Sequence, residues 1–459
     1  MALLTQVRMA NFKSWEDTGA IRLAPLTVFF GKNSSGKSSL LQAALLMKQT
    51  AESLDPRQVL DLGTDNSYVD LGTYLDFICD HDDLRHLELS FTWTTDAPVP
   101  LRQVGTRPLS ASIFGFEVSL GLESRRTRRL GEITVDKMDY TIGLSGNRRV
   151  GLQLQPNGEY ELYTHGMTMT RRRGRPSSLP GPIKCYAFPE AVFNAYQNAD
   201  FLAELSLQFD KLMSGISYVG PLRDNPQRSY QWRGSSPTSV GPRGESTVAA
   251  ILAARGQGRR VGRQPGRGRP YRSFEENLGY WLNRMGIIEE FAVEELAPGT
   301  DLYELRVTVS GGRTPVSITD VGFGVSQVLP VLVQVFYAPS GSPVVLEQPE
   351  IHLHPAAQSE LGDVLIQAIK DNGVQLLVET HSEHLLRRIQ RRVAEAEIES
   401  KDVALYFIDT RDGRSHIRQL VVDEYGNIAN WPDGFFGDEI GDLSAMTEAG
   451  MRRRGIRLA

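Results

Sequence analysis

The sequence predicts an α/β protein with a mainly parallel sheet, an N-terminal antiparallel β portion and a helical insertion region. Three observations lead to this prediction. Apolar runs of strand length alternate with helical segments through residues 301–415, which is typical of parallel strands joined by helices. Near the N-terminus, a strand, a Gly-rich turn and a helix follow one another. Residues 85–165 carry several runs in which apolar and polar side chains alternate, as they do in antiparallel strands.

The periodicity also places the individual elements. Strands are expected over residues 4–12 and 21–30 with a turn around Asp17–Gly19, and a helix is expected to begin near Lys37. A helix near 198–214 precedes a short strand in ISYVGP. The remaining predicted elements are a helix over 274–289, strands over 303–309 and 315–319, a helix from about 325, a strand over 343–347, a helix over 355–370, a strand over 374–379, a helix over 382–398 and a strand over 403–409.

Length and composition restrict the class of protein. The chain has 459 residues, which suits two or three lobes, and its formal net charge is −5, so nucleic acid would have to bind through local basic patches. Cys79 and Cys185 are far apart in sequence, which argues against a disulfide framework or a zinc ribbon. The N-terminus lacks the apolar region of a signal peptide, and no apolar run approaches the ~20 residues that span a bilayer. We therefore expect a cytoplasmic protein without a membrane segment.

The stretch GKNSSGKS matches the phosphate-loop pattern GxxxxGK[ST]. Glycines let backbone N–H groups turn towards a phosphate, and the following helix adds its positive N-terminal end. Lys37 is expected to reach the β- and γ-phosphates of ATP, and Ser38 to ligate Mg²⁺. The alternative is a Gly/Ser turn that only caps a helix. The predicted nucleotide-binding residues of this loop are Gly31, Lys32, Asn33, Ser34, Ser35, Gly36, Lys37, Ser38 and Ser39.

The stretch VVLEQPE places acidic residues at the end of an apolar strand. Glu347 follows this strand directly, and a carboxylate there can hold Mg²⁺ directly or through water. Gln348 comes next, where an amide can position a water molecule but cannot take its proton. Glu350 is therefore a candidate substitute base. The alternative is a solvated turn in which Glu347 and Glu350 only precede and cap the helix at Pro355.

A histidine follows a second apolar strand in LLVETHSEH. His381 begins a helix there and could reach the γ-phosphate or the attacking water. His352 and His354 raise the alternative of a zinc site shared with His381, but no His/Cys cluster with zinc spacing accompanies them. The predicted catalytic residues are thus Glu347, Gln348, Glu350 and His381, and the predicted metal ligands are Ser38 and Glu347.

A second helix terminus that could bind phosphate lies in TDVGFGVSQVLPVL. One nucleotide rarely needs two such ends from the same chain. Two ends make sense if each protomer of a pair supplies Gly322, Gly324 and Ser326 to its partner's ATP. The alternative is an ordinary helix cap with glycine at a close-packed turn.

Basic and aromatic segments outside these motifs could contact partners. Three patches are rich in arginine, at residues 125–129, 171–175 and 255–272. They could follow nucleic-acid phosphates or could be solvated linkers. Arg223 and Arg228 are candidates for phosphate or partner contacts, and a surface salt bridge is an equal alternative. The aromatic segment WPDGFF, Trp431 to Phe436, could dock on its own core, which we favour, or on a partner.

Taken in order, these motifs resemble the ATPase heads of the ABC type, in the branch with SMC, RecF and the overcoming-lysogenization-defect (OLD) proteins. LAPLTVFFGKNSSGKSSLLQ resembles the Walker A segment, VGFGVSQVLP a diverged signature loop, VLEQPEIHLHP a Walker B with its D-loop, and ETHSEHLL the switch-histidine segment. The chain also resembles stand-alone prokaryotic AAA-like ATPases with EQPE-HLHP, a YVGPLR segment beginning at Tyr218, and a WP-x-GFF tail. Two positions depart from the usual pattern: Glu347 stands where Asp is usual, and Gln348 stands where Glu is usual.

The resemblance implies an Mg²⁺-dependent ATPase that forms a homodimer, or a higher oligomer of dimers, around ATP. It also points to the gating of a separate effector, with a nuclease as one candidate, in prokaryotic genome defence. Slow turnover is predicted from Gln348, whose amide cannot take a proton. The alternatives are an ATP-dependent DNA clamp in repair and a scaffold that binds ATP without turnover. The expected parts of the chain are an N-terminal portion of the head with a β-rich insertion (1–235), an Arg/Gly-rich loop and helical insertion (236–300), a C-terminal portion of the head (301–415) and a tail (416–459).

Overall fold

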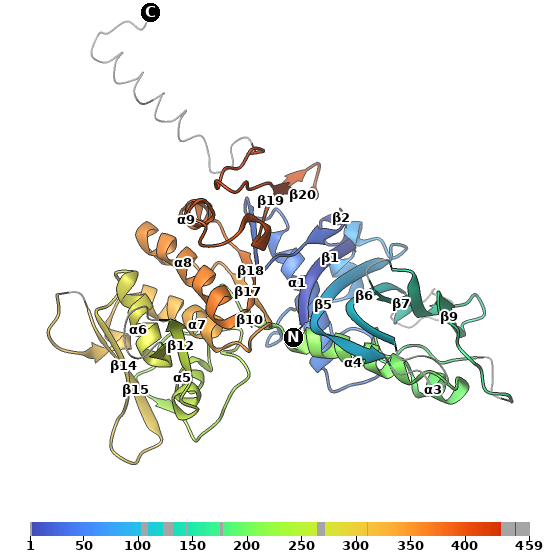
Figure 1. Ribbon diagram of the computed structural model, residues 1–459, viewed down its shortest axis with the longest axis horizontal. Helices are drawn as coiled ribbons and strands as arrows, with labels where there is room; N and C mark the ends of the chain where they lie inside the picture. Colours follow the sequence, from blue (N-terminus) through green and yellow to red (C-terminus); the bar gives the residue numbers. More distant parts are fainter. Residues whose placement is uncertain are drawn as a thin grey trace, which may run out of the picture.

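A central sheet joins two lobes of different construction (Figure 1). The computed structural model describes residues 2–101, 109–122, 132–143, 146–174, 178–263, 271–309, 311–432 and 446. One lobe is built around an antiparallel sheet from the first half of the chain, and the other is mainly helical and comes from the second half. The predicted α/β class is confirmed, and so is its antiparallel N-terminal portion.

The central sheet is mainly parallel, as predicted. Its strand order is β10 (Ser217–Val219), β17 (Pro343–Glu347), β18 (Gln375–Glu379), β4 (Leu26–Gly31), β19 (Val403–Arg411) and β20 (Arg414–Leu420). The first five strands are parallel, and β20 returns antiparallel to β19. Both faces are covered, which explains the apolar runs in β4, β17 and β18. Along β17, Val344 and Leu346 pack in one hydrophobic core and Val345 packs in the other.

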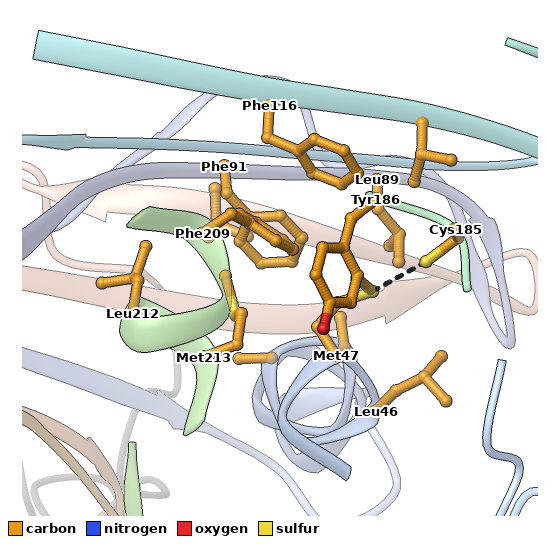
Figure 2. Packing of buried hydrophobic residues seen from close by; sticks show 14 of the residues in the cluster. Leu46, Met47, Leu89, Phe91, Phe116, Cys185, Tyr186, Phe209, Leu212 and Met213 are labelled. Atoms are coloured by element: carbon orange, nitrogen blue, oxygen red, sulfur yellow. Dashed lines mark hydrogen bonds between the residues drawn. The ribbon is translucent and has the colours of Figure 1, made fainter. Parts of the chain in front are cut away.

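The antiparallel sheet covers one face of the central sheet together with helices α1 (Lys37–Glu52) and α4 (Asp200–Ser214). Its strands are β1 (Ala2–Phe12), β2 (Trp15–Asp17), β3 (Ile21–Arg22), β5 (Leu87–Leu101), β6 (Leu109–Leu122), β7 (Ile133–Ile142), β8 (Arg148–Leu154) and β9 (Tyr160–His165). Phe116 from this sheet lies 4.1 Å, between ring centroids, from Phe209 of α4. Figure 2 shows this aromatic core beside Met47 of α1, whose sulfur lies 4.0 Å from the thiol of Cys185. Cys79 and Cys185 are both buried free thiols.

The helical lobe covers the opposite face of the central sheet (Figure 1). Its long helices are α5 (Thr247–Gly256), α6 (Phe274–Arg284), α7 (Phe323–Tyr337), α8 (Pro355–Asn372) and α9 (Glu383–Ala394). Its short strands are β11 (Tyr230–Gln231), β12 (Arg260–Arg263), β13 (Tyr271–Ser273), β14 (Glu290–Glu295), β15 (Leu302–Thr308) and β16 (Val316–Ser317). The remaining elements are α2 (Tyr74–Phe77), α3 (Glu190–Ala195) and 3₁₀ turns at Cys79–His81, Ile318–Asp320 and Ser400–Asp402.

The predicted strand over residues 21–30 is wrong in one respect, because it is two strands in two sheets. Residues Ile21–Arg22 pair with β1 in the antiparallel sheet, whereas β4 begins at Leu26 and pairs with β18 and β19. Pro25 lies between them, where it lacks a backbone N–H to donate to a continuous ladder. The chain changes sheets there, and this change brings the phosphate loop to the edge of the central sheet.

Candidate nucleotide-binding site

The carboxyl ends of β4, β17 and β18 meet at one edge of the central sheet. Glu347 ends β17 and Glu379 ends β18, and the two residues are register partners. A cavity of about 400 Å³ lies beside this edge, which is a size typical of small-molecule sites. Its lining residues are Lys13, Ser14, Asn33, Ser34, Ser35, Gly36, Lys37, Ser38, Ser39, Gln42, Gln348, Glu379 and His381. The structure therefore brings the predicted phosphate loop together with Gln348 and His381.

The phosphate loop joins β4 to α1, as the motif predicts, and its backbone needs glycine. Gly36 has φ +97°, and a Cβ there would collide with the side chains of Ser415 and Trp15. The same two neighbours hold the loop: Trp15 Nε1 donates to Gly36 O at 3.1 Å, and Ser415 Oγ donates to Ser35 O at 2.7 Å. These two hydrogen bonds fix the carbonyl groups of Ser35 and Gly36, and the loop lines the cavity where a phosphate would bind.

Lys37 is the buried cation of this loop and is only 3% exposed. Its Nζ donates a hydrogen bond to the carbonyl oxygen of Lys32 at 2.6 Å. Burial lowers the pKa of the ammonium group, and the carboxylates of Glu379 and Glu350 oppose that change. An ammonium group that has lost water and lies in a Gly-rich loop is well placed for a charge-assisted bond to phosphate.

Glu347 is buried at the end of β17, as the sequence predicts, and its carboxyl group turns towards β10. Its Oε1 accepts a hydrogen bond from the hydroxyl of Tyr218 at 3.1 Å, and Glu347 is not among the residues that line the cavity. Burial, and then the charge of Glu379, raise the pKa of Glu347 to about 7, while Tyr218 and Lys13 oppose the rise. The site thus contains a carboxyl group that changes charge near neutral pH.

This raised pKa predicts a specific pH dependence of stability. The folded state holds a proton on Glu347 up to about pH 7, whereas the unfolded chain releases it near the ordinary value of 4.5. The contribution of Glu347 to the free energy of unfolding is therefore largest below the ordinary pKa. It falls by at most about 3 kcal/mol as the pH rises to about 7. Thermal unfolding of the protein without nucleotide, from about pH 5 to about pH 8, should show Glu347→Gln gaining stability over wild type only at the alkaline end. Equal differences at both ends would contradict the assignment.

The backbone N–H groups of Gln348 and His381 donate hydrogen bonds that position these two residues. The Gln348 N–H donates to Glu379 O at 2.8 Å, with Gln348 in the left-handed region at φ +44°. The His381 N–H donates to Glu350 Oε1 at 2.9 Å, while its ring stays exposed at the cavity. Burial and the charge of Lys37 lower the pKa of His381, which favours the neutral ring. Glu350 is itself buried behind the cavity, so its observed contact is structural, and its role as a base stays a prediction.

The two histidines of HLHP serve other contacts. His354 Nδ1 accepts the N–H of Ala356 at 3.4 Å and caps α8. The ring of His352 packs edge-on against Phe323, with 5.3 Å between the ring centroids. Among the residues that the structure describes, no group of three or more His, Cys, Asp or Glu side chains is arranged to hold a metal ion by itself.

The loop at Gly322, Gly324 and Ser326 does not join the cavity of its own chain. Gly322 caps the start of α7, and Ser326 Oγ donates to Phe323 O at 2.8 Å. Ser326 lines a different cavity, next to Tyr230. The side chain of Phe323 is 49% exposed at the start of this helix. Gly322, Gly324 and Ser326 thus lie away from the cavity of their own chain, and their contact with a partner's nucleotide stays a prediction.

Arg223 and Arg228 make different contacts from each other. Arg223 is buried, and its guanidinium donates to the carbonyl oxygens of Gln327, Glu347 and Gln348 at 3.0, 3.1 and 3.2 Å. The surface salt bridge considered for Arg223 is not observed, because the side chain is buried and fastens β17 to α7. A phosphate or partner contact of Arg223 stays a prediction. Arg228 forms the alternative that we considered, an exposed ion pair with Asp320 at 2.8 Å.

The arginine-rich patches are only partly within the described residues. Arg255 pairs with Glu275, and Arg259 donates to the carbonyl oxygens of Tyr337 and Ala338. These two arginines bind the protein itself. The patch at 125–129, residue 175 and residues 264–270 lie outside the described residues.

The tail is likewise only partly described. Trp431 packs against the core of the helical lobe, and the guanidinium of Arg387 lies 5.1 Å from the centroid of its ring. Docking on the protein's own core is thus confirmed for Trp431. Residues 433–436 of the same segment lie outside the described residues.

Four cavity residues were not expected from the sequence. Lys13 and Ser14 come from the turn between β1 and β2, and Gln42 comes from α1, where it accepts a hydrogen bond from Lys13 Nζ at 2.6 Å. No local pattern marks these three, because only the tertiary fold brings them to the loop. Glu379 carries a visible signal: it directly follows the apolar run of β18, as Glu347 follows that of β17.

Two family models match parts of the chain. Residues 190–387 match the family described as "AAA domain, putative AbiEii toxin, Type IV TA system", and residues 398–446 match "Protein of unknown function (DUF3696)". No curated protein matches the chain. Within the described part of the chain, every helix is too short or too polar to cross a bilayer.

Solved structures similar to this chain include heads of SMC proteins. An Smc head bound to the C-terminal winged-helix domain of ScpA is 12% identical, with 92% of this chain and 98% of that chain covered and a TM-score of 0.42. An Smc head with an extended coiled coil, bound to the C-terminal domain of ScpA and derived from Pyrococcus furiosus, is 11% identical, with coverages of 92% and 97% and a TM-score of 0.43. The SMC head domain from Thermotoga maritima is 11% identical, with coverages of 91% and 99% and a TM-score of 0.37. Residues 190–387 are thus similar to an AAA domain, and the phosphate loop at the sheet edge agrees with an ATPase of that type.

Proposed function

We propose that this protein binds Mg²⁺·ATP, hydrolyses it slowly, and acts as a nucleotide-dependent switch that dimerises and gates a separate effector protein. The observation that carries the proposal is the cavity in which the phosphate loop meets the carboxyl ends of β17 and β18. Residues Gly31 to Ser39 would hold the phosphates, with Lys37 on the β- and γ-phosphates. Ser38 and an acid at the carboxyl ends of β17 and β18, for which the sequence predicts Glu347, would hold Mg²⁺, which neutralises phosphate charge when it is bound.

The residues fit this metal and nucleotide on independent grounds. The loop accepts no Cβ at Gly31, where it would overlap the carbonyl oxygen of Ile408, and none at Gly36. In the described part of the chain, the Oγ of Ser35 and the Oε2 of Glu379 are buried without a hydrogen-bond partner. Both groups belong to residues that line the cavity. Buried oxygens without a partner are costly unless a ligand supplies one.

Dimerisation is proposed from the separation of the two phosphate-binding ends. Gly322, Gly324 and Ser326 lie at the exposed start of α7 and away from the cavity of their own chain. Phe323 beside them is 49% exposed, and Leu222 is 79% exposed. A two-fold pair would use the same contact twice and would cover such apolar side chains. The description of the matching family names a toxin of a toxin–antitoxin system, which supports a role in prokaryotic genome defence.

Hydrolysis is proposed to be slow because Gln348, which lines the cavity, has an amide group in place of a carboxylate base. Gln348→Glu supplies a general base at that position, and we expect single-turnover ATP hydrolysis to rise by about 100-fold. Light scattering on the same samples should show a shorter-lived ATP-bound dimer, since hydrolysis ends the closed state. The matched control is Gln42→Glu, which makes the same change elsewhere in the cavity and should give no gain.

Two outcomes would count against this proposal. Unchanged hydrolysis in Gln348→Glu would show that the amide does not limit the rate. A wild-type protein that binds ATP but releases no phosphate over many hours would favour the scaffold instead. Nucleotide binding and phosphate release are therefore measured separately, on the same preparation.

A further inference from the structure

We propose that Glu379, rather than Glu347, is the carboxylate that faces Mg²⁺ beside Ser38, with Glu347 supporting it from the neighbouring strand. This inference rests on the proposed function and assigns a further residue to the same site. It starts from strand order: β18 lies between β17 and the phosphate-loop strand β4. Glu379 pairs with Glu347 on one side and with Phe29 of β4 on the other. Since neighbouring strands are about 4.8 Å apart, Glu379 starts one strand nearer to the phosphate loop.

The side chains of the two acids point to different surroundings. Glu379 lines the cavity together with Lys37 and Ser38, although it is only 3% exposed. Ser38 and Lys37 both act on its carboxylate, and they oppose the rise of its pKa that burial causes. Glu347 instead accepts, at Oε1, a hydrogen bond from the hydroxyl of Tyr218 on β10. The acid that meets the predicted metal-binding serine is thus Glu379.

The carboxyl group of Glu379 has one oxygen available to a ligand. Its Oε2 is buried and has no hydrogen-bond partner among the described residues. The ammonium group of Lys37 is held by the carbonyl oxygen of Lys32 at 2.6 Å. Mg²⁺ takes oxygen ligands and is commonly held by one or two carboxylates together with substrate phosphates. A metal between Ser38, the phosphates and Glu379 would satisfy that oxygen.

The test measures how strongly Mg²⁺ and ATP support each other's binding, without relying on hydrolysis. The affinity for a fluorescent ATP analogue is determined with Mg²⁺ and with EDTA, and the ratio of the two dissociation constants is the metal coupling. We expect Glu379→Gln to shrink this ratio by about 10- to 100-fold. In EDTA, binding should be unchanged or tighter, because a negative charge near the phosphates has been removed. Glu379→Asp keeps the charge and should recover part of the ratio.

Three comparisons make the result decisive. Glu347→Gln should shrink the ratio less than Glu379→Gln does. Glu383→Gln removes the same charge from the start of α9, where Glu383 pairs with Arg387, and should leave the ratio unchanged. An unchanged ratio in Glu379→Gln, or an equal loss of binding in EDTA and in Mg²⁺, would overturn the inference. Lys37→Ala distinguishes failure of this inference from failure of the proposed function. Normal ATP binding in Lys37→Ala would rule out the proposed nucleotide site itself.

Discussion

Lys37→Ala should abolish ATP binding and hydrolysis, with a loss of about 100-fold or more in kcat/KM. The ammonium group is buried in the phosphate loop, lines the cavity and donates to a carbonyl group of the same loop, so it lies where a phosphate could bind. Replacing it leaves the γ-phosphate charge without its nearest cation, and the carboxylates of Glu379 and Glu350 then repel the nucleotide. Equilibrium binding of ATP and steady-state phosphate release measure the two losses.

Two further variants separate charge from folding. Lys37→Met keeps the apolar stem but removes the charge, and it should lose binding as Lys37→Ala does. Lys211→Ala removes one charge from the exposed end of α4, far from the loop in sequence, and should bind ATP normally. Normal hydrolysis in Lys37→Ala would sink the assignment of the phosphate loop, whatever the fold.

The parts of the fold that sequence predicts well are those in which a local pattern decides the structure. The strand–loop–helix unit around Gly31–Ser38 and the strands that end at Glu347 and Glu379 have apolar runs of strand length, which both faces of the central sheet require. Their common edge follows from parallel pairing, so the meeting of Lys37, Gln348 and His381 could be expected.

Features that depend on contacts between distant segments could not be predicted from the sequence. Two further features have a local signal but were not predicted. Trp15 and Ser415 brace the phosphate loop from positions far apart in sequence, and no spacing rule connects them. The β19–β20 hairpin was missed although it has a local signal: Asp412 and Gly413 both have positive φ between the paired Arg411 and Arg414. An Asp-Gly dipeptide in that setting is a strong hairpin turn. The sheet change at Pro25 was likewise marked by the proline itself.

Arg223 lies in surroundings that exclude one role considered from the sequence, a surface salt bridge, because the residue is only 6% exposed. Burial lowers its pKa to about 10, which still leaves the guanidinium charged at neutral pH. Its charge is balanced by three backbone carbonyl groups and by the nearby carboxylate of Glu350. This structural role of Arg223 can be recognised only in the folded chain, where β17 and α7 meet.

Arg223→Ala should therefore destabilise the edge of the central sheet that carries the site, by about 3–5 kcal/mol. The substitution leaves the carbonyl groups of Gln327, Glu347 and Gln348 without their donor, and each such loss costs about 1–3 kcal/mol when the group stays buried. Hydrogen exchange of the β17 amides should accelerate by about 100-fold or more, because local opening becomes easier by that free energy. ATP hydrolysis should fall with it, since two of the carbonyl groups belong to residues assigned to the catalytic edge.

The matched control for this prediction is Arg228→Ala, which removes an arginine from the same segment. Arg228 makes an exposed ion pair with Asp320, so its loss should cost less than about 1 kcal/mol and should leave exchange at β17 unchanged. Arg223→Lys should resemble Arg223→Ala rather than wild type, because one ammonium group cannot reproduce a planar fork that reaches three carbonyl groups. If Arg223→Lys behaves as wild type, the charge alone matters at this position. If Arg223→Ala leaves exchange at β17 unchanged, the guanidinium does not fasten β17 to α7.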